Sequence, residues 1–127
     1  MENKLAGKDN ALPQRVEKPW GFEILFAVTS GYAGKVLFVK KGRRLSFHYH
    51  QIKDEVLYVH EGKVNLEIER DSGSKKSLTL CAGECVRIYP FTRHRIAATE
   101  DTTLFEVSTP DLYDVVRLED DYGRTDR

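Results

Sequence analysis

Residues 42–62 read GRRLSFHYHQIKDEVLYVHEG, and this stretch decides the fold. His48 and His50 are separated by one residue, so on a β-strand both imidazoles point to the same side of the sheet. Glu55 follows five residues later and directly precedes the apolar run Val56–Val59, which ends at a glycine turn. The stretch therefore predicts two short strands that place two imidazoles and a carboxylate near one another.

Strand-like segments continue on both sides of this stretch. Val64, Leu66 and Ile68 alternate with polar residues, which is the period of a half-buried strand. Further apolar runs recur about every 8 to 12 residues, separated by turn residues, as in an all-β sandwich or barrel. These runs are Phe22–Val28, Val36–Val39, Leu78–Leu80, Val86–Ile88, Arg95–Ala98 and Leu104–Val107. We therefore predict an all-β fold, a small barrel whose interior can hold one ligand.

The 127 residues are the length of one domain. Residues 1–15 are mostly polar and include glycine and proline, which predicts a flexible N-terminal segment. Residues 16–127 are predicted to form the single folded domain. Because no segment of the central chain shows a sustained helical period, a helix is expected only as a short element in about the last 15 residues.

Charge and composition exclude several kinds of partner. Twenty Lys and Arg balance twenty Asp and Glu, whereas a dedicated nucleic-acid binder normally carries a positive excess. No apolar run approaches the roughly 20 residues that span a bilayer, and no secretory signal is evident, so we expect a cytoplasmic protein without a membrane partner. Cys81 and Cys85 are expected to be unpaired, partly buried thiols, as is usual in that compartment.

His94 supplies a third imidazole from a distant part of the sequence. Three imidazoles and one carboxylate are a common ligand set for a divalent first-row metal with open coordination positions. We therefore predict that His48, His50, Glu55 and His94 bind a metal. The ligand set does not choose among Zn, Mn, Fe, Ni and Co. His60 lies outside the pattern and is expected to be a surface or core histidine.

The spacing of residues 42–62 resembles the first motif of the cupin superfamily at every fixed position. His94 stands at the histidine of the second cupin motif. Tyr89, Phe91 and Ala98 occupy positions where that second motif usually has proline, glycine and asparagine. The resemblance implies a double-stranded β-helix, or jelly-roll barrel, with its metal inside.

Four segments are more specifically similar to the cupin domain of type II mannose-6-phosphate isomerases. They are Val16–Gly21, Leu45–Phe47, Thr92–Ile96 and Val116–Arg124. We expect a stand-alone domain, without the guanylyltransferase domain to which that family is often fused. His48 departs from the glutamine that is frequent in the family, so metal binding is retained while the substrate or reaction can have diverged.

This second resemblance implies a metal-dependent isomerase that interconverts mannose 6-phosphate and fructose 6-phosphate through an enediolate. A metal can stabilise the enediolate as a Lewis acid, and a positioned base can move the proton. Lys53 and Arg95 match basic positions of the family and are predicted to bind phosphate or stabilise the enediolate. Glu106 has a counterpart there and is the third candidate catalytic residue, with an exposed strand glutamate as its alternative interpretation.

Basic residues gather around the predicted ligands. Residues 24–53 contain six Lys or Arg and no Asp or Glu, and Arg87, Arg93 and Arg95 flank the second motif. Such a concentration of one charge favours an anionic ligand, here a sugar phosphate. A solvated basic face is the alternative.

Two other functions stay open. A metal- or sugar-binding module without turnover fits the altered second motif, and an iron-dependent dioxygenase fits three histidines and a glutamate. Small cupins are commonly homodimers, so we expect a homodimer. Trp20 is predicted to anchor the N-terminal strand or to stack on a sugar. Glu119–Arg124 is predicted to dock on the barrel or on a partner subunit.

Overall fold

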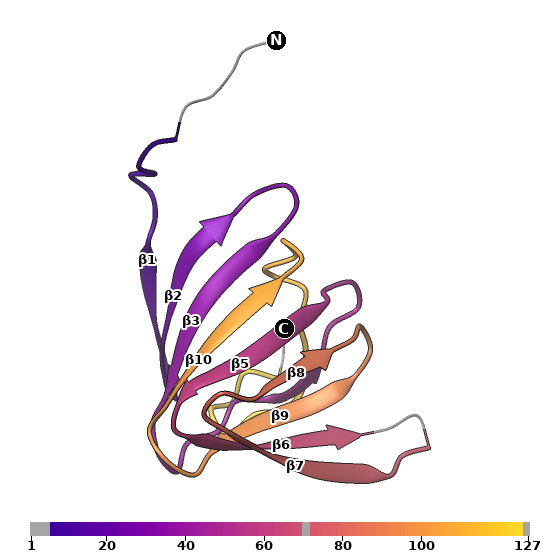
Figure 1. The fold of residues 1–127 in the computed structure, drawn as a ribbon. Coiled ribbons are helices and arrows are strands. Elements are labelled where there is room, and N and C mark those ends of the chain that lie inside the picture. The colour runs from indigo at the N-terminus through magenta and orange to yellow at the C-terminus, as the bar shows by residue number, and fades with distance from the viewer. Residues whose placement is uncertain (1–5, 70–71, 126–127) are drawn as a thin grey trace.

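The computed structural model describes residues 6–69 and 72–125, which form two antiparallel β-sheets (Figure 1). The six-stranded sheet contains, in spatial order, β1 (Gln14–Lys18), β2 (Gly21–Val28), β3 (Ala33–Val39), β10 (Thr102–Ser108), β5 (Glu55–Glu61) and β8 (Cys85–Ile88). The five-stranded sheet contains β11 (Val116–Glu119), β4 (Phe47–Tyr49), β9 (Arg93–Ala98), β6 (Lys63–Glu69) and β7 (Lys75–Cys81). The predicted all-β jelly roll is confirmed.

Strands from distant parts of the sequence alternate in both sheets. In the six-stranded sheet β10 lies between β3 and β5, and in the five-stranded sheet β9 lies between β4 and β6. This crossing of early and late strands brings the first histidine motif, on and after β4, beside the second motif on β9. The jelly-roll topology therefore assembles the predicted site.

The interior between the sheets is apolar over much of its length. Each strand turns alternate side chains inward, so the period-two pattern of the sequence fills the core. Complete burial of one such side chain contributes about 1.5–3 kcal/mol. The core consists of Trp20, Leu37, Val39, Leu57, Val59, Val64, Leu66, Leu80, Ile88, Ile96, Ala98 and Leu104. Trp20 packs in this core, as expected of an anchor, and it also lines the cavity, where it could stack on a sugar.

The C-terminal region differs from the prediction. The described residues contain no helix, and the expected C-terminal helix is wrong because residues 116–119 pair with the free edge of β4 as strand β11. Within the described ranges, accordingly, no helix is long and apolar enough to cross a membrane. At the other end β1 begins at Gln14, whereas residues 1–5 of the predicted flexible segment lie outside the described residues.

Gly62 of the first motif is required by its surroundings. Its φ is +99°, a conformation that side chains rarely adopt, and an added Cβ would lie 2.4 Å from the carbonyl oxygen of Asp101. Phe91 also has a positive φ, of 65°, at the position where the second cupin motif usually has glycine. The turn before β9 therefore places a non-glycine residue in a left-handed conformation.

Cys81 and Cys85 are free, as predicted, but both are exposed, so their predicted partial burial is wrong. They flank the turn between β7 and β8, where neither side chain faces the core.

Glu119–Arg124 docks on the barrel, as predicted. Its Asp121 forms an ion pair with Arg44 at 2.6 Å, and the Tyr122 ring packs against the core.

Candidate metal centre

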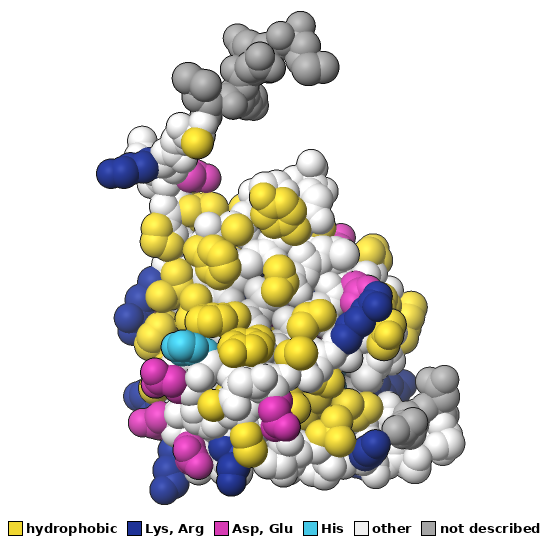
Figure 2. Space-filling view, in the orientation of Figure 1, with side chains coloured by type: hydrophobic (Ala, Val, Ile, Leu, Met, Phe, Trp, Pro, Cys, Tyr) yellow, Lys and Arg dark blue, Asp and Glu magenta, His cyan; other side chains and the backbone are white. Residues whose placement is uncertain are grey.

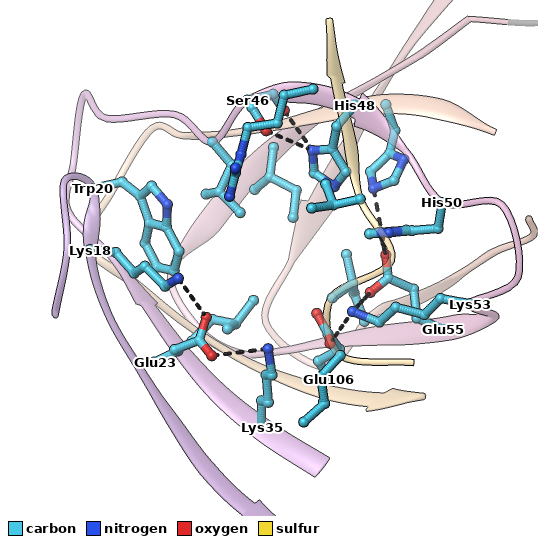
Figure 3. Close-up of a pocket in the computed structure, with 18 of the residues that line it drawn as sticks. Lys18, Trp20, Glu23, Lys35, Ser46, His48, His50, Lys53, Glu55 and Glu106 are labelled. Carbon is cyan, nitrogen blue, oxygen red and sulfur yellow. Dashed lines mark hydrogen bonds and ion pairs between the residues drawn. The ribbon is translucent and has the colours of Figure 1, made fainter. Parts of the chain in front are cut away.

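The fold brings the three predicted imidazoles together. His48 lies on β4, His50 directly follows that strand, and the backbone of β9 pairs with β4 between His94 and His48. All three side chains are buried, and they offer nitrogen atoms that lie within 4.8 Å of one another. These nitrogens face the cavity drawn in Figure 3. The arrangement is a compact group of three metal-binding side chains.

Backbone carbonyls set the orientation of each ring. His48 Nδ1 donates to the carbonyl of Ser46 at 3.0 Å, His94 Nδ1 donates to that of Thr92 at 2.8 Å, and His50 Nδ1 donates to that of Asp114. A carbonyl can only accept, so each Nδ1 carries a proton and each Nε2 is left with a lone pair for a metal. Burial, together with the neighbouring His94 and His50, lowers the pKa of His48 and favours its neutral, ligating form.

Glu55 completes the predicted ligand set from the start of β5. Its Oε1 lies 3.3 Å from Nε2 of His50 and 3.5 Å from Nε2 of His94. Burial alone would raise the pKa of this carboxyl, but its contacts with the His50 and His94 side chains and the charge of Lys53 hold the pKa well below its ordinary value. A buried carboxylate therefore faces imidazole nitrogens at the point where a cation would bind.

This donor set fits a divalent metal. It offers two imidazole lone pairs beside a carboxylate and a third imidazole close by, which is the chemistry that Zn, Mn and Fe take in proteins. His60 is not part of the group, because its side chain is 51% exposed and lies on the outer side of β5. The interpretation of His60 as a surface histidine is confirmed.

Asp114, which the sequence analysis did not single out, fixes the segment between His50 and Glu55 of the first motif. The Asp114 carboxylate accepts hydrogen bonds from the backbone N–H groups of Gln51, Ile52 and Lys53, at 2.7–3.1 Å. Burial opposes ionisation of Asp114, but these bonds outweigh it and lower its pKa. Since the Asp114 carbonyl also accepts from His50, one residue orients both a ligand and the chain that follows it.

Lys53 and Glu106 form a buried pair beside the ligands. Lys53 Nζ lies 2.9 Å from Oε2 of Glu106 and 3.6 Å from Oε2 of Glu55. Burial and the charge of Glu55 raise the pKa of Glu106 to about 7. Burial would lower the pKa of Lys53, but the two carboxylates outweigh it and raise the pKa. Glu106 faces inward, so the alternative of an exposed strand glutamate is wrong.

The remaining candidate catalytic residue, Arg95, lies outside the cavity. Arg95 is next to the inward-facing His94 on β9, so its side chain points to the other face of the sheet, and it does not line the cavity. It is buried by the C-terminal segment, where it donates to the carbonyls of Leu45 and Glu119 at 3.1 and 3.2 Å. Strand alternation already indicated this placement in the sequence.

The basic residues that the sequence analysis placed around the ligands, those of residues 24–53 together with Arg87, Arg93 and Arg95, form the predicted basic cluster, and only some of them line the cavity. Lys35 and Lys53 line it. Three other members form ion pairs outside it, namely Arg44 with Asp121, Arg87 with Asp54 and Arg93 with Glu69.

Three cations outside the predicted basic cluster, Lys18, Arg117 and Arg124, also line the cavity. Lys18 on β1 and Lys35 on β3 share the Glu23 carboxylate, at 3.6 and 2.9 Å, on the side opposite the histidines (Figure 3). The five cationic lining residues, Lys53 included, outnumber the three carboxylates, so the wall carries a positive excess. The signal for Lys18, Arg117 and Arg124 was their place in the segments that resemble the isomerase family.

The fold and the buried imidazoles define a jelly-roll protein with a metal-binding group in its interior. Residues 35–108 match the family described as cupin domain, and the chain belongs to that family. A comparison with curated proteins found no match.

Solved structures share this fold over most of the chain. A variant of B. subtilis oxalate decarboxylase aligns with a TM-score of 0.78 at 15% identity, over 92% of this chain and 34% of that chain. Lactobacillus farciminis oxalate decarboxylase gives 0.72 at 18% identity, over 83% and 33%. KdgF from Halomonas sp. gives 0.68 at 22% identity, over 83% and 94%. The chain thus spans about a third of the oxalate decarboxylases, and these similarities show the fold alone.

Proposed function

We propose that this cupin is a metal-dependent isomerase of a sugar phosphate, with mannose 6-phosphate and fructose 6-phosphate as the leading pair. The observation that carries the proposal is the buried Lys53–Glu106 pair, 2.9 Å apart, beside the metal-binding group. Buried titratable groups with shifted pKa values beside a cavity are typical of catalytic sites, and a binding module has no need of a second acid and base next to its metal. The pair therefore favours an enzyme.

The side chains have separate roles in this proposal. His48, His50, His94 and Glu55 would hold the divalent metal, which supplies Lewis-acid stabilisation of the negative charge that develops on the sugar oxygens. Bacillus subtilis oxalate decarboxylase has Mn(II) centres, which makes manganese one candidate.

Glu106 moves the proton. Its carboxylate takes the proton from the carbon next to the sugar carbonyl and returns it to the neighbouring carbon, which interconverts aldose and ketose. Lys53 Nζ holds Oε2 of Glu106 in place and adds positive charge beside the reacting oxygens. Buried at the wall, neither side chain is free to turn away into solvent.

The cationic wall supports a phosphate group on the substrate. Lys18 and Lys35 lie across the cavity from the histidines, on either side of the Glu23 carboxylate, so this wall offers two ammonium groups to an anion. In a hexose 6-phosphate the phosphate is likewise at the opposite end of the carbon chain from C1 and C2. Metal-binding oxygens and phosphate would thus meet opposite walls of the same cavity.

The proposal is tested by metal analysis followed by NMR in deuterated water. Metal-replete protein is incubated with a panel of hexose and pentose phosphates. We expect loss of the C2 proton signal of mannose 6-phosphate and appearance of the fructose 6-phosphate spectrum, without oxygen consumption.

Other outcomes distinguish the alternatives. Unchanged spectra for every sugar phosphate, with metal bound, would contradict the isomerase. Oxygen uptake with a carbon acid would indicate the iron-dependent dioxygenase. Thermal stabilisation by a sugar phosphate without proton exchange would indicate the binding module.

A further inference from the structure

The two faces of the six-stranded sheet present different chemistry. On the outer face, hydrophobic side chains gather over β2, β3, β10 and β5 (Figure 2). The inner face borders the cavity, and each of its lysines contacts a carboxylate, Lys53 that of Glu106, and Lys18 and Lys35 that of Glu23. Two neutral side chains that line the same cavity, in contrast, have a hydrogen-bond donor without an acceptor.

Trp20 is the first of these two side chains. It is 4% exposed and belongs to the hydrophobic core, so core side chains cover most of its ring. Its indole N–H can only donate, and none of the described residues accepts a hydrogen bond from it. Among those residues no side-chain nitrogen that is shut off from solvent lacks a partner, so this N–H is open to the cavity that Trp20 lines.

Ser46 is the second side chain. It is buried and also lines the cavity. Its Oγ lies 2.9 Å from Nδ1 of His48, and that nitrogen carries a proton because it also lies 3.0 Å from the Ser46 carbonyl, which can only accept. The hydroxyl oxygen can therefore only accept from His48. Its own hydrogen is left without an acceptor among the residues that the structure describes.

The two donors lie on one part of the cavity wall. In Figure 3, Trp20 and Ser46 are placed between Lys18 on one side and His48 on the other. A buried donor without a partner is unfavourable, and native proteins contain few of them. Both donors require the same chemistry, an oxygen acceptor, and both lie between the metal-binding group and the lysines of the opposite wall.

We propose that Trp20 and Ser46 recognise hydroxyl oxygens in the middle of the ligand and so determine which sugar phosphates the cavity accepts. This inference rests on the proposed function, in which the ligand extends from the metal-binding group to Lys18 and Lys35. In a hexose 6-phosphate, the hydroxyl groups between C2 and C6 occupy that stretch. The indole N–H and the serine O–H donate to two of these oxygens. Trp20 thus meets the sugar with its N–H edge and not with the face of its ring.

The single tryptophan of the chain makes a direct test possible, because its indole N–H gives one signal in a proton–nitrogen correlation spectrum. The ligand for this test is the hexitol phosphate made by reducing mannose 6-phosphate. It keeps the hydroxyl and phosphate groups but has no carbonyl, so it cannot be isomerised. Added to metal-replete protein, it should move the indole proton signal downfield. Inorganic phosphate, which has no sugar chain, should leave the signal in place.

Two conservative variants separate recognition from packing. Trp20→Phe keeps an aromatic ring and removes the N–H, and Ser46→Ala keeps the carbonyl that accepts from His48. A neutral hydrogen bond corresponds to about 2- to 10-fold in affinity, so each variant should weaken hexitol phosphate binding by that factor. The affinities for metal and for inorganic phosphate should not change, whereas a disturbed fold would lower them too. Ser77→Ala, at an exposed serine of β7, is the matched control for Ser46→Ala.

Each result decides for or against the two donors. A shifted indole signal with selective loss of hexitol phosphate affinity supports them. Hexitol phosphate that binds without moving the signal, or that both variants bind like the wild type, overturns the inference and leaves the isomerase proposal intact. A shifted signal without proton exchange from any sugar phosphate supports the donors and contradicts the isomerase. Absence of hexitol phosphate binding overturns both. Should Trp20→Phe not fold, the wild-type spectrum decides.

Discussion

The barrel interior has a polar half and an apolar half that are built from the same strands. Along β5 the inward positions run from Glu55 through Leu57 to Val59. Along β9 they run from His94 through Ile96 to Ala98. A step of two residues along a strand thus separates a candidate ligand from a core residue.

This comparison shows how a small domain tolerates buried charge. Burying an ionised side chain is unfavourable unless it is paired and hydrogen-bonded, as Glu55, Lys53 and Glu106 are. The apolar half supplies the hydrophobic stabilisation that offsets this cost. The two halves should therefore respond differently to substitution, the first in metal binding and turnover and the second in stability.

The largest effect is expected at the ligands. His94→Ala removes one of three imidazoles and should weaken metal binding by more than about 100-fold, the upper range for residues that only orient a ligand. His60→Ala, at an exposed histidine, is the control and should bind metal like the wild type. Metal titration followed by calorimetry measures both. Equal affinities for the two variants would show that the polar half is not a metal site.

Glu106→Gln tests the acid next to the ligands. A general base contributes roughly 10²–10⁴-fold to a rate, so proton exchange should fall by about that factor. Metal content should not change, since glutamine fills the same space and Glu106 is not in the ligand set. Glu100→Gln, at an exposed residue, should leave the exchange rate unaltered. A Glu106→Gln variant with wild-type exchange would assign the base to another residue.

Leu104→Ala tests the apolar half on the same strand as Glu106. Leu104 is fully buried, so its truncation should lower the free energy of unfolding by about 2–5 kcal/mol. The metal stoichiometry of the folded protein should be that of the wild type. Leu118→Ala, at a partly exposed leucine, should cost less than about 1 kcal/mol. Denaturant titration measures the free energy of unfolding of both variants. Loss of metal by the folded Leu104→Ala variant would mean that the polar and apolar halves of the interior are not independent.

The smallest effect concerns the segment that closes the polar half. Asp120 accepts hydrogen bonds from Arg124, and these lower the pKa of Asp120 below its ordinary value of 3.8. A lowered pKa stabilises the fold above pH 3.8, and this contribution is lost as pH falls through the folded-state pKa. The difference in Tm between wild type and Asp120→Asn should therefore shrink in acid. A difference independent of pH would exclude this ionisation as its cause.

The sequence by itself was sufficient for the all-β class and for the residues of the metal-binding group. The spacing of His48, His50 and Glu55 is local, and the period of a strand decides which side chains share a face. Matching positions of a known motif then supplied His94. These inferences needed no knowledge of which strands are neighbours.

Only the tertiary structure decided which charges line the cavity and where the chain leaves apolar surface uncovered. Lys18 and Arg117 reach the cavity because β1 and β11 join opposite sheets, and the exposed side chains of Phe105 and Tyr58 lie side by side because β10 pairs with β5. The C-terminal segment became a strand because β4 offered it a free edge. Strand pairing joins residues far apart in the chain, and its free energy depends on contacts that no local pattern contains.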